Sequence, residues 1–363
     1  MKKLIILDHF LTDNKGHDEQ YDFTVAREAL RRGIVTEVWS PKRKGLQPEF
    51  VKQCLKMPFW KSSSLLGTIL AALGSIFEWR ALFQREELDM DTVVLIQTIK
   101  FPILGFLSLG LVGISVKPKL AIVLRRGLEN GIAKTLMKYL YTRKNTIFLP
   151  DSELITEELL NEGFKNAKTL PIPHMPAREA PGKENGRVVG YFGEARYDKG
   201  FDLLPGLIEK VLKEDQRASF IIQSNVHKRT AAVAGAVGRL FNLRGPRVEI
   251  IDRYVADSEY AALMRKCSIV LIPYRAKLYG KGTSGILAEA IACCKWVVVP
   301  ASTWMADQKM KYPKISLFTE PTVESIAKAI KACEGDFPGL EQRIDEWYKF
   351  HSAENYLNIL SSV

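Results

Sequence analysis

The sequence predicts an α/β protein built from two doubly wound parallel sheets. Its 363 residues are long for one domain and sufficient for two separate cores. Short, β-branched apolar runs alternate with helical patterns in both halves, as expected for parallel strands covered on both faces. The stretch between the halves, 170–186, is rich in Pro and Gly and lacks periodicity, which indicates a linker. The simplest architecture is two such domains facing a cleft.

Each half contains five expected strands. In the first half a helix is expected over 21–32, where Phe23, Ala26 and Leu30 form one apolar stripe. In the second half a helix is expected to begin near Asp202, after the first strand. The strands are the apolar runs 3–7, 35–39, 92–96, 120–124 and 146–149, and then 188–192, 219–223, 247–251, 269–273 and 296–300.

The net charge of +11 indicates an anionic partner, which can be a phosphate-bearing ligand, a nucleic acid or a membrane surface. Nucleic acid is not expected, because the basic residues are not interleaved with stacking aromatics and no recognition motif is present. The five cysteines show neither ligand spacing nor an even framework, which favours reduced thiols in a cytosol. The opening "MKKLIILDHF" has too short an apolar core for a signal peptide, and Asp8 interrupts it.

Two apolar segments raise the question of a membrane. "FPILGFLSLGLVGISV" (101–116) is shorter than the roughly 20 residues that span a bilayer, so a buried helix and its turn are expected. The segment 62–79 follows a basic stretch that contains Phe59 and Trp60. Its helical pattern allows either a core-facing helix or a membrane-surface element over 42–77 that meets anionic lipid. The residues on that helical face are Leu66, Ile69, Leu70, Leu73, Ile76 and Phe77.

The stretch "YFGEARYDKGFDLL" (191–204) carries the first strand of the second half into a turn with two cations. Gly193 and Gly200 allow the backbone to come close to a ligand. Arg196 offers a forked donor and Lys199 a point charge, which together can neutralise a pyrophosphate. In an open parallel sheet such turns line the ligand crevice. The turn therefore predicts a diphosphate site, with a solvated surface turn as the alternative.

A second glycine-rich loop, in "YGKGTSGILAEAIACCKWVVVP" (279–300), leads into a helix. Its backbone N–H groups and the positive end of the helix dipole are expected to point at one spot. Glu289 lies about one turn into that helix, where its carboxylate can accept from the vicinal hydroxyls of a ribose; an exposed, solvated Glu is the alternative. The residues of the loop are Gly280, Lys281, Gly282, Thr283, Ser284 and Gly285.

With these two loops the chain resembles the GT-B retaining glycosyltransferases of family four. Members of that family have a Gly…Lys-Gly turn after the first strand of the C-terminal domain, here Gly193 and Lys199–Gly200. They also have a helix bearing Glu-Ala, here Glu289–Ala290, before an apolar strand. The tail 346–360 resembles the closing helix of the family. The resemblance covers nearly all of the second half and the tail, and in the first half it rests on the strand pattern and a glycine loop.

The resemblance implies the GT-B fold, with two Rossmann-like domains facing a central cleft. It implies an acceptor-binding domain over 1–175, a nucleotide-sugar-binding domain over 186–345, and a crossover helix over 346–363 that packs on the first domain. It further implies retaining transfer from a nucleotide-diphosphate sugar to a saccharide or lipid-linked acceptor. No metal cofactor is expected, because Arg196 and Lys199 can neutralise the diphosphate and no Asp-x-Asp or His/Cys ligand cluster occurs in the loops concerned. The expected setting is cell-surface polysaccharide or lipopolysaccharide synthesis, in the cytoplasm or at the inner face of the cell membrane.

The resemblance also assigns the donor contacts. Arg196 and Lys199 would hold the diphosphate close to Gly193, and Glu289 would hold the ribose. The amides of 282–285, beside Lys281, Thr283 and Ser284, would meet the phosphate or the sugar. The base would lie around 223–225 and 251–254, with Gln223 and Tyr254 as the candidates.

The acceptor side is expected in the loop 8–21 after the first strand. There His17, which follows Gly16, is the candidate for contacting the reacting hydroxyl, because imidazole exchanges protons near neutral pH. A helix-capping or merely exposed histidine is the alternative. Arg125 and Arg126, after the fourth strand, are candidates for binding an anionic acceptor.

The sequence departs from the family at two site positions. In the family an Arg usually follows the glycine, but here Glu194 occupies that position. Arg196, two residues downstream, would then bind the diphosphate in its place. Lys281 replaces the first of two glutamates, the one that normally contacts the transferred sugar. Two alternatives therefore remain open: a non-catalytic nucleotide-sugar-binding relative or partner subunit, and a GT-B sugar-diphosphate epimerase.

Overall fold

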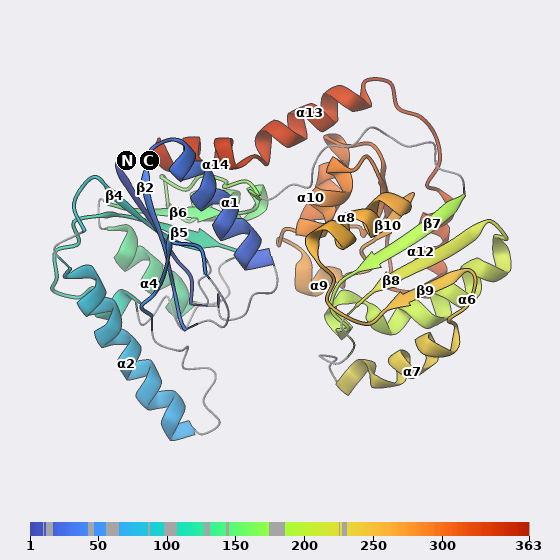
Figure 1. Ribbon diagram of the computed structural model, residues 1–363, viewed down its shortest axis with the longest axis horizontal. Helices are drawn as coiled ribbons and strands as arrows, with labels where there is room; N and C mark the ends of the chain where they lie inside the picture. The colour runs from blue at the N-terminus through green and yellow to red at the C-terminus, as the bar shows by residue number, and fades with distance from the viewer. Residues whose placement is uncertain are drawn as a thin grey trace. The chain divides into compact units, whose positions relative to one another are not determined.

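In the computed structural model the chain forms two units, each built on a six-stranded parallel sheet (Figure 1). Unit 1 comprises Met1–His174 and His351–Val363, and unit 2 comprises Met175–Phe350. The structure describes residues 1–9, 11, 17–42, 47–55, 65–85, 88–97, 107–125, 127, 131–142, 145–173, 186–224, 226 and 231–362; within these, the side chains of 17, 18, 65–72, 75, 131–133 and 136 are not described.

The sheet of unit 1 has the strand order β3-β2-β1-β4-β5-β6, so the winding direction reverses between β1 and β4. All of its strand pairs are parallel. The strands are β1 (Lys3–Leu7), β2 (Val35–Ser40), β3 (Val51–Gln53), β4 (Thr92–Ile96), β5 (Lys119–Leu124) and β6 (Thr146–Pro150). The helices are α1 (His17–Arg31), α2 (Leu65–Phe83), α4 (Gly131–Tyr141), α5 (Glu153–Asn161) and α14 (Ala353–Ser361).

The sheet of unit 2 has the order β12-β11-β10-β7-β8-β9 and reverses between β7 and β10. Its strand pairs are parallel as well. The strands are β7 (Arg187–Phe192), β8 (Ala218–Gln223), β9 (Val248–Ile251), β10 (Ile269–Leu271), β11 (Trp296–Pro300) and β12 (Ile315–Phe318). The α-helices are α6 (Leu204–Glu214), α7 (Ala234–Asn242), α8 (Asp257–Lys266), α9 (Ala276–Tyr279), α10 (Gly285–Ala292), α11 (Trp304–Asp307), α12 (Val323–Lys331) and α13 (Leu340–Phe350).

Side-chain alternation along the strands explains why both faces of each sheet are covered. In β1, Ile5 and Leu7 contribute to one buried cluster, whereas Leu4 and Ile6 contribute to another on the opposite face. A strand that is buried on both faces needs apolar residues at successive positions, and this is the pattern that predicted the parallel sheets.

The ten expected strands are present, with ends that differ by two residues at most. Two further strands, β3 and β12, were not expected. Strand β3 is only three residues long, and its Lys52 and Gln53 are exposed, so no apolar run marks it. Strand β12 has four residues at the far edge of its sheet.

The tail, expected as one helix over 346–363, contains parts of two. Helix α13 belongs to unit 2, where the Trp347 indole donates to the carbonyl of Ala288 at 3.3 Å. Helix α14 belongs to unit 1, where its Tyr356, Leu357 and Leu360 join a buried cluster. The break lies at Ser352, whose hydroxyl caps α14 by accepting from the amide of Asn355 at 3.0 Å.

Helix α2 is core-facing on one side only. Trp79, Leu82 and Phe83 are buried, but Leu73 and Phe77 are 50% and 72% exposed. The interpretation of 62–79 as a core-facing helix is therefore wrong at Leu73 and Phe77, and the side chains of Leu66, Ile69 and Leu70 lie outside the described residues. In the part of the chain that the structure describes, no helix combines the length and the apolarity needed to cross a membrane.

Candidate functional site

The two glycine-rich loops are brought together by the pairing of β7 with β10, which aligns Tyr191 with Leu271. From this pair the chain winds outward to β9 on one side and to β12 on the other. The loops that follow both strands therefore leave the same edge of the sheet, at the point where its winding reverses. In open parallel sheets this is where ligands bind.

A close backbone contact joins the two loops. Gly200 has φ +70°, and a Cβ at this position would overlap the carbonyl oxygen of Pro273. The amide of Arg275 donates to the carbonyl of Asp198 at 3.0 Å. The Arg275 guanidinium also donates to the carboxylate of Asp202 at 2.6 Å. The turn after β7 is therefore held in one position relative to the loop after β10.

Arg196, a predicted diphosphate ligand, is already engaged by carboxylates of its own turn. Its guanidinium donates to both carboxylate oxygens of Asp198 and, at 3.0 Å, to Glu194. The hydrogen bond to Asp198 is the main reason why the pKa of Arg196 is raised. An anionic ligand would have to share or replace these partners, so Arg196 is less available than the sequence suggested.

Lys199, the second predicted diphosphate ligand, has a different environment. Its side chain is 17% exposed, and its Nζ lies 3.9 Å from the Glu194 carboxylate and 5.7 Å from the ring centroid of Tyr274. Desolvation lowers the pKa of its ammonium group. A largely buried cation whose neighbouring Glu194 carboxylate lies 3.9 Å away gains free energy when an anion binds beside it.

Sequence reasoning missed two tyrosines and one acid at this site. The Tyr279 hydroxyl donates to Asp198 at 2.9 Å, and its ring lies 4.5 Å from that of Tyr274. Burial raises the pKa of Tyr274, whose hydroxyl also forms a hydrogen bond with Ser284. Tyr274 and Tyr279 directly precede the glycine-rich loop 280–285, and Asp198 lies between Arg196 and Lys199 in the cationic turn after β7. These positions in the sequence were the signal that could have identified the three residues.

Helix α10 points its amino-terminal end at the same edge of the sheet. The Ser284 hydroxyl caps the helix by accepting from the amide of Leu287 at 3.3 Å. Ser284 is buried, Gly282, Thr283 and Gly285 are partly buried, and Lys281 is exposed. The amides at the start of α10 thus lie next to a loop that can reach a ligand.

Glu289, the predicted ribose ligand, is 3% exposed, which excludes the alternative of an exposed glutamate. Its carboxylate accepts from the Tyr260 hydroxyl at 2.7 Å. Burial raises the pKa of Glu289 to about 7. The Tyr260 ring packs against Phe192, the last residue of β7, with 5.3 Å between centroids. Glu289 is thereby linked to the strand that leads into the cationic turn.

The predicted base contacts lie at the end of β8 and after β9. The Gln223 side chain is buried and donates to the carbonyl of Arg253 at 2.8 Å, so it supports the neighbouring loop. Its backbone carbonyl accepts from the amide of Gly193 at 3.1 Å, which places Gln223 beside the cationic turn. Tyr254 is 36% exposed.

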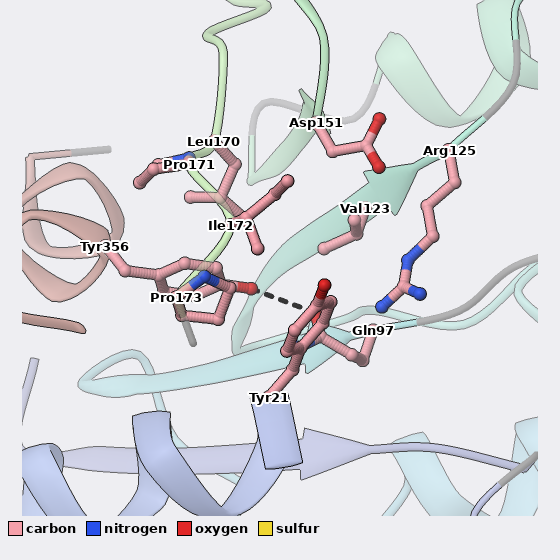
Figure 2. Close-up of a pocket in the computed structure, with 10 residues that line it drawn as sticks. All are labelled: Tyr21, Gln97, Val123, Arg125, Asp151, Leu170, Pro171, Ile172, Pro173 and Tyr356. Atoms are coloured by element: carbon pink, nitrogen blue, oxygen red, sulfur yellow. Dashed lines mark hydrogen bonds between the residues drawn. The ribbon is translucent and has the colours of Figure 1, made fainter. Parts of the chain in front are cut away.

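The acceptor-side candidates belong to unit 1. His17 is the first residue of α1, but its side chain lies outside the description, as do Gly16 and Arg126 entirely. Arg125 follows β5, and its guanidinium lies 5.4 Å from the ring centroid of Tyr21 (Figure 2). Both line a pocket of about 20 Å³, in which the Tyr356 hydroxyl donates to Gln97 at 2.9 Å. This volume holds about one water molecule.

Across the described ranges, no three His, Cys, Asp or Glu side chains are grouped so that they could hold a metal ion.

No protein-family model matches the sequence, and no curated protein is significantly similar to it. The fold, in contrast, is similar to solved structures along its full length. A UDP-forming α,α-trehalose-phosphate synthase from Burkholderia xenovorans, in complex with glucose-6-phosphate, has a TM-score of 0.69 at 12% identity over 99% of each chain. The corresponding enzyme from Burkholderia vietnamiensis has a TM-score of 0.70 at 11% identity, over 100% of this chain and 99% of the other. A glycosyltransferase from Rickettsia africae has a TM-score of 0.66 at 13% identity over all of both chains.

These likenesses confirm the predicted fold class. The chain has the GT-B architecture of two Rossmann-like domains, each with a parallel six-stranded sheet covered by helices.

Proposed function

We propose that this chain is a retaining glycosyltransferase that moves a sugar from a nucleotide-diphosphate sugar to a saccharide or lipid-linked acceptor. One observation carries the proposal: at the reversal point of the unit 2 sheet, Lys199 Nζ lies 5.7 Å from the ring centroid of Tyr274, whose hydroxyl bonds Ser284, the N-cap of α10. This arrangement suits a diphosphate. The similarity in fold to UDP-forming synthases supports the same donor class.

The proposed catalysis is electrostatic. Cleavage of the sugar–phosphate bond leaves negative charge on the diphosphate, and donors that already point at that charge lower the barrier. Lys199 supplies a largely buried ammonium group, and the amides of 282–285 supply the positive end of α10. Arg196 contributes once the ligand displaces Glu194 from its guanidinium. On this proposal neutralisation comes from side chains and amides and needs no metal cofactor.

The remaining donor contacts follow from the same placement. We assign the ribose to Glu289, whose position is held by Tyr260. The base is assigned to the loops beside Gln223 and Tyr254. On the acceptor side, His17 and Arg125 are the candidates to contact the reacting hydroxyl and an anionic group. A sugar phosphate is one acceptor to test, since glucose-6-phosphate is bound in a structure of similar fold.

Membership of family four and the biological setting belong to the same proposal. They rest on Gly193, Lys199–Gly200 and Glu289–Ala290, the positions that match the family motif. The setting is cell-surface polysaccharide or lipopolysaccharide synthesis, on the cytoplasmic side of the membrane.

Titration calorimetry with UDP, GDP and their sugar conjugates tests the proposal. We expect one nucleotide diphosphate to bind and the Lys199→Met variant to weaken its affinity about 10- to 100-fold, the effect of losing one strong charged contact. Lys210→Met is the matched control, because Lys210 lies on α6 and pairs with Glu214 at 2.9 Å. The proposal is wrong if no nucleotide diphosphate binds, or if both variants bind like the wild type.

Two observations favour binding without transfer. Arg196 is engaged by two carboxylates, and Lys281 stands where the family has a glutamate. A non-catalytic relative would bind the nucleotide sugar and turn over neither donor nor acceptor. An epimerase would convert the donor without any acceptor. Product analysis with and without acceptor distinguishes these three activities.

A further inference from the structure

Unit 2 contains a cavity of about 270 Å³ at the edge of its sheet opposite the two glycine-rich loops. Its lining comes from the starts of β7 and β8, from the second halves of α6 and α12, and from residues just after these helices. The glycine-rich loops instead follow the last residues of β7 and β10. Arg187 begins β7 and Phe192 ends it, a distance of roughly 16 Å along an extended strand. The cavity is therefore separate from the proposed donor site.

The core of unit 2 holds the cavity in shape. Helices α6 and α12 begin side by side, since a Cβ on Gly206 would lie 3.4 Å from a methyl carbon of Val323. Farther along these helices, Val211, Ala327 and Ile330 belong to the buried cluster and also line the cavity, so we call them the apolar floor. The volume is close to the lower end, about 300 Å³, of sites that take small organic ligands.

Charged side chains of both signs surround the apolar floor. Three are cations and three are carboxylates, so their formal charges cancel: Arg187, Arg217 and Lys331, and Glu214, Asp215 and Glu334. A polyanion such as a nucleotide would face three carboxylates, and a polycation would face three cations. Balanced charge around apolar side chains therefore favours a ligand that carries both signs and an apolar group.

Arg187 is a largely buried cation whose carboxylate partner is not close. Its side chain is 18% exposed, and its guanidinium lies 3.5 Å from the Asp215 carboxylate, longer than the roughly 2.7–2.9 Å of a strong charged hydrogen bond. The same carboxylate also lies 3.7 Å from Nε of Arg217. Two guanidinium groups thus share one carboxylate. A second carboxylate, supplied by a ligand, would complete the hydrogen bonds of Arg187.

Lys331 and Glu334 supply one further charge of each sign. Both are exposed, and among the residues that the structure describes neither side chain has a hydrogen bond or an ion pair. Glu214, in contrast, pairs with Lys210 at 2.9 Å. Lys331 is consequently available for a ligand carboxylate and Glu334 for a ligand ammonium group.

We propose that this cavity binds an α-amino acid with an apolar side chain. The ligand carboxylate pairs with Arg187 and Lys331, its ammonium group pairs with Glu334, and its side chain packs on the apolar floor. The inference goes beyond the proposed transfer reaction and does not depend on it, since none of these residues is among the proposed donor or acceptor contacts.

Titration calorimetry of the full chain with L-leucine, L-valine and L-methionine tests the inference. We expect at least one of them to bind. Isocaproate and isoamylamine, which are leucine without its amino group and without its carboxylate, should bind at least about tenfold more weakly than leucine, because each lacks one charged group. Lys331→Met and Glu334→Gln should each weaken amino-acid binding about tenfold. Lys328→Met and Glu324→Gln, at exposed positions of α12 outside the lining, are the matched controls.

UDP and GDP are titrated into the same variants in parallel. Lys331→Met and Glu334→Gln should leave nucleotide binding unchanged, so failure of this inference and failure of the proposed donor site are distinguishable. The inference is overturned if none of the three amino acids binds, or if both variants bind them like the wild type. Isocaproate that binds as tightly as leucine would assign the cavity to simple carboxylates instead. Binding of inorganic phosphate but of no amino acid, abolished by Lys331→Met, would assign it to phosphate.

Discussion

The carboxylate of Glu289 accepts a hydrogen bond from the hydroxyl of Tyr260, with 2.7 Å between the two oxygens. Glu289 is buried, and burial penalises its charged carboxylate more than the hydrogen bond from Tyr260 stabilises it. The pKa of Glu289 is consequently about 7 instead of 4.5. The protonation state of the proposed ribose ligand therefore changes near neutral pH.

Glu289→Gln should remove a pH dependence of stability. The raised pKa means that the fold favours the protonated acid, so the wild type loses free energy of unfolding as pH rises from about 4.5 to about 7. The loss is at most about 3 kcal/mol, from roughly 1.4 kcal/mol per pKa unit. The glutamine side chain would stay neutral, and the variant should gain relative to the wild type over this range. Urea unfolding across the pH series measures the difference. Glu320→Gln, at an exposed glutamate, is the control, and a constant difference would contradict the assignment.

Glu194→Gln should strengthen binding of a nucleotide diphosphate. The Glu194 carboxylate lies 3.0 Å from a guanidinium nitrogen of Arg196 and 3.9 Å from Nζ of Lys199, so it competes with the ligand for both cations. We expect a three- to tenfold lower dissociation constant, in line with about 1 kcal/mol for a partly exposed pair. Calorimetry measures it, with Glu209→Gln on α6 as the control. Weaker binding would show that Glu194 supports the site instead.

Gly200→Ala should destabilise unit 2 and impair the site. The residue has φ +70°, and its Cβ would overlap the Pro273 carbonyl, so the two loops must move apart. Gly339→Ala is a matched control, with φ +75° and no atom within 4 Å of the added Cβ. We expect about 1 kcal/mol of destabilisation for the control and about 3 kcal/mol or more for Gly200→Ala. Denaturant unfolding and nucleotide binding test this, and equal effects would refute the close contact.

Sugar transfer should be insensitive to chelation of divalent cations. The proposal assigns neutralisation of the diphosphate to Lys199 and the α10 amides, so EDTA should leave kcat unchanged. Lys199→Met should lower kcat about 100-fold or more, as for loss of one preformed donor to a developing charge. Steady-state assays of transfer measure both. Loss of activity with EDTA, restored by added Mg²⁺, would show that a metal ion neutralises the diphosphate.

The sequence predicted the sheets well because a strand that is buried on both faces is recognisable as a run of successive apolar residues. Runs such as 92–96 and 296–300 are apolar at nearly every position, and both are buried strands. The edge strand β3 leaves no such mark, since two of its three residues are exposed. The sequence also did not show that Leu73 and Phe77 face solvent, but for a different reason. An apolar residue on a helix can be buried or displayed, and its neighbours in the chain do not decide which.

The candidate site could be predicted as two segments but not as one arrangement. Gly193, Lys199 and the loop 280–285 were visible because glycines and cations cluster in the chain. Glu194 was visible too, but its contact with Arg196 was not, because a guanidinium can point to solvent or to its own turn; Asp198 was missed. Tyr260 and Tyr279 were missed, since they reach Glu289 and Asp198 from elsewhere in the chain.

The sequence by itself determined the α/β class, the alternation of strands and helices, and which residue types stand at the ends of β7 and β10. These properties depend on the periodicity of apolar residues and on local backbone preference, and both are determined by residues close together in the chain. Only the tertiary structure decided that Lys199 is largely buried while Arg196 is paired, and that Glu289 is buried against Tyr260. Burial and pairing depend on contacts between segments far apart in the chain, and desolvation at those contacts sets the charge of each group.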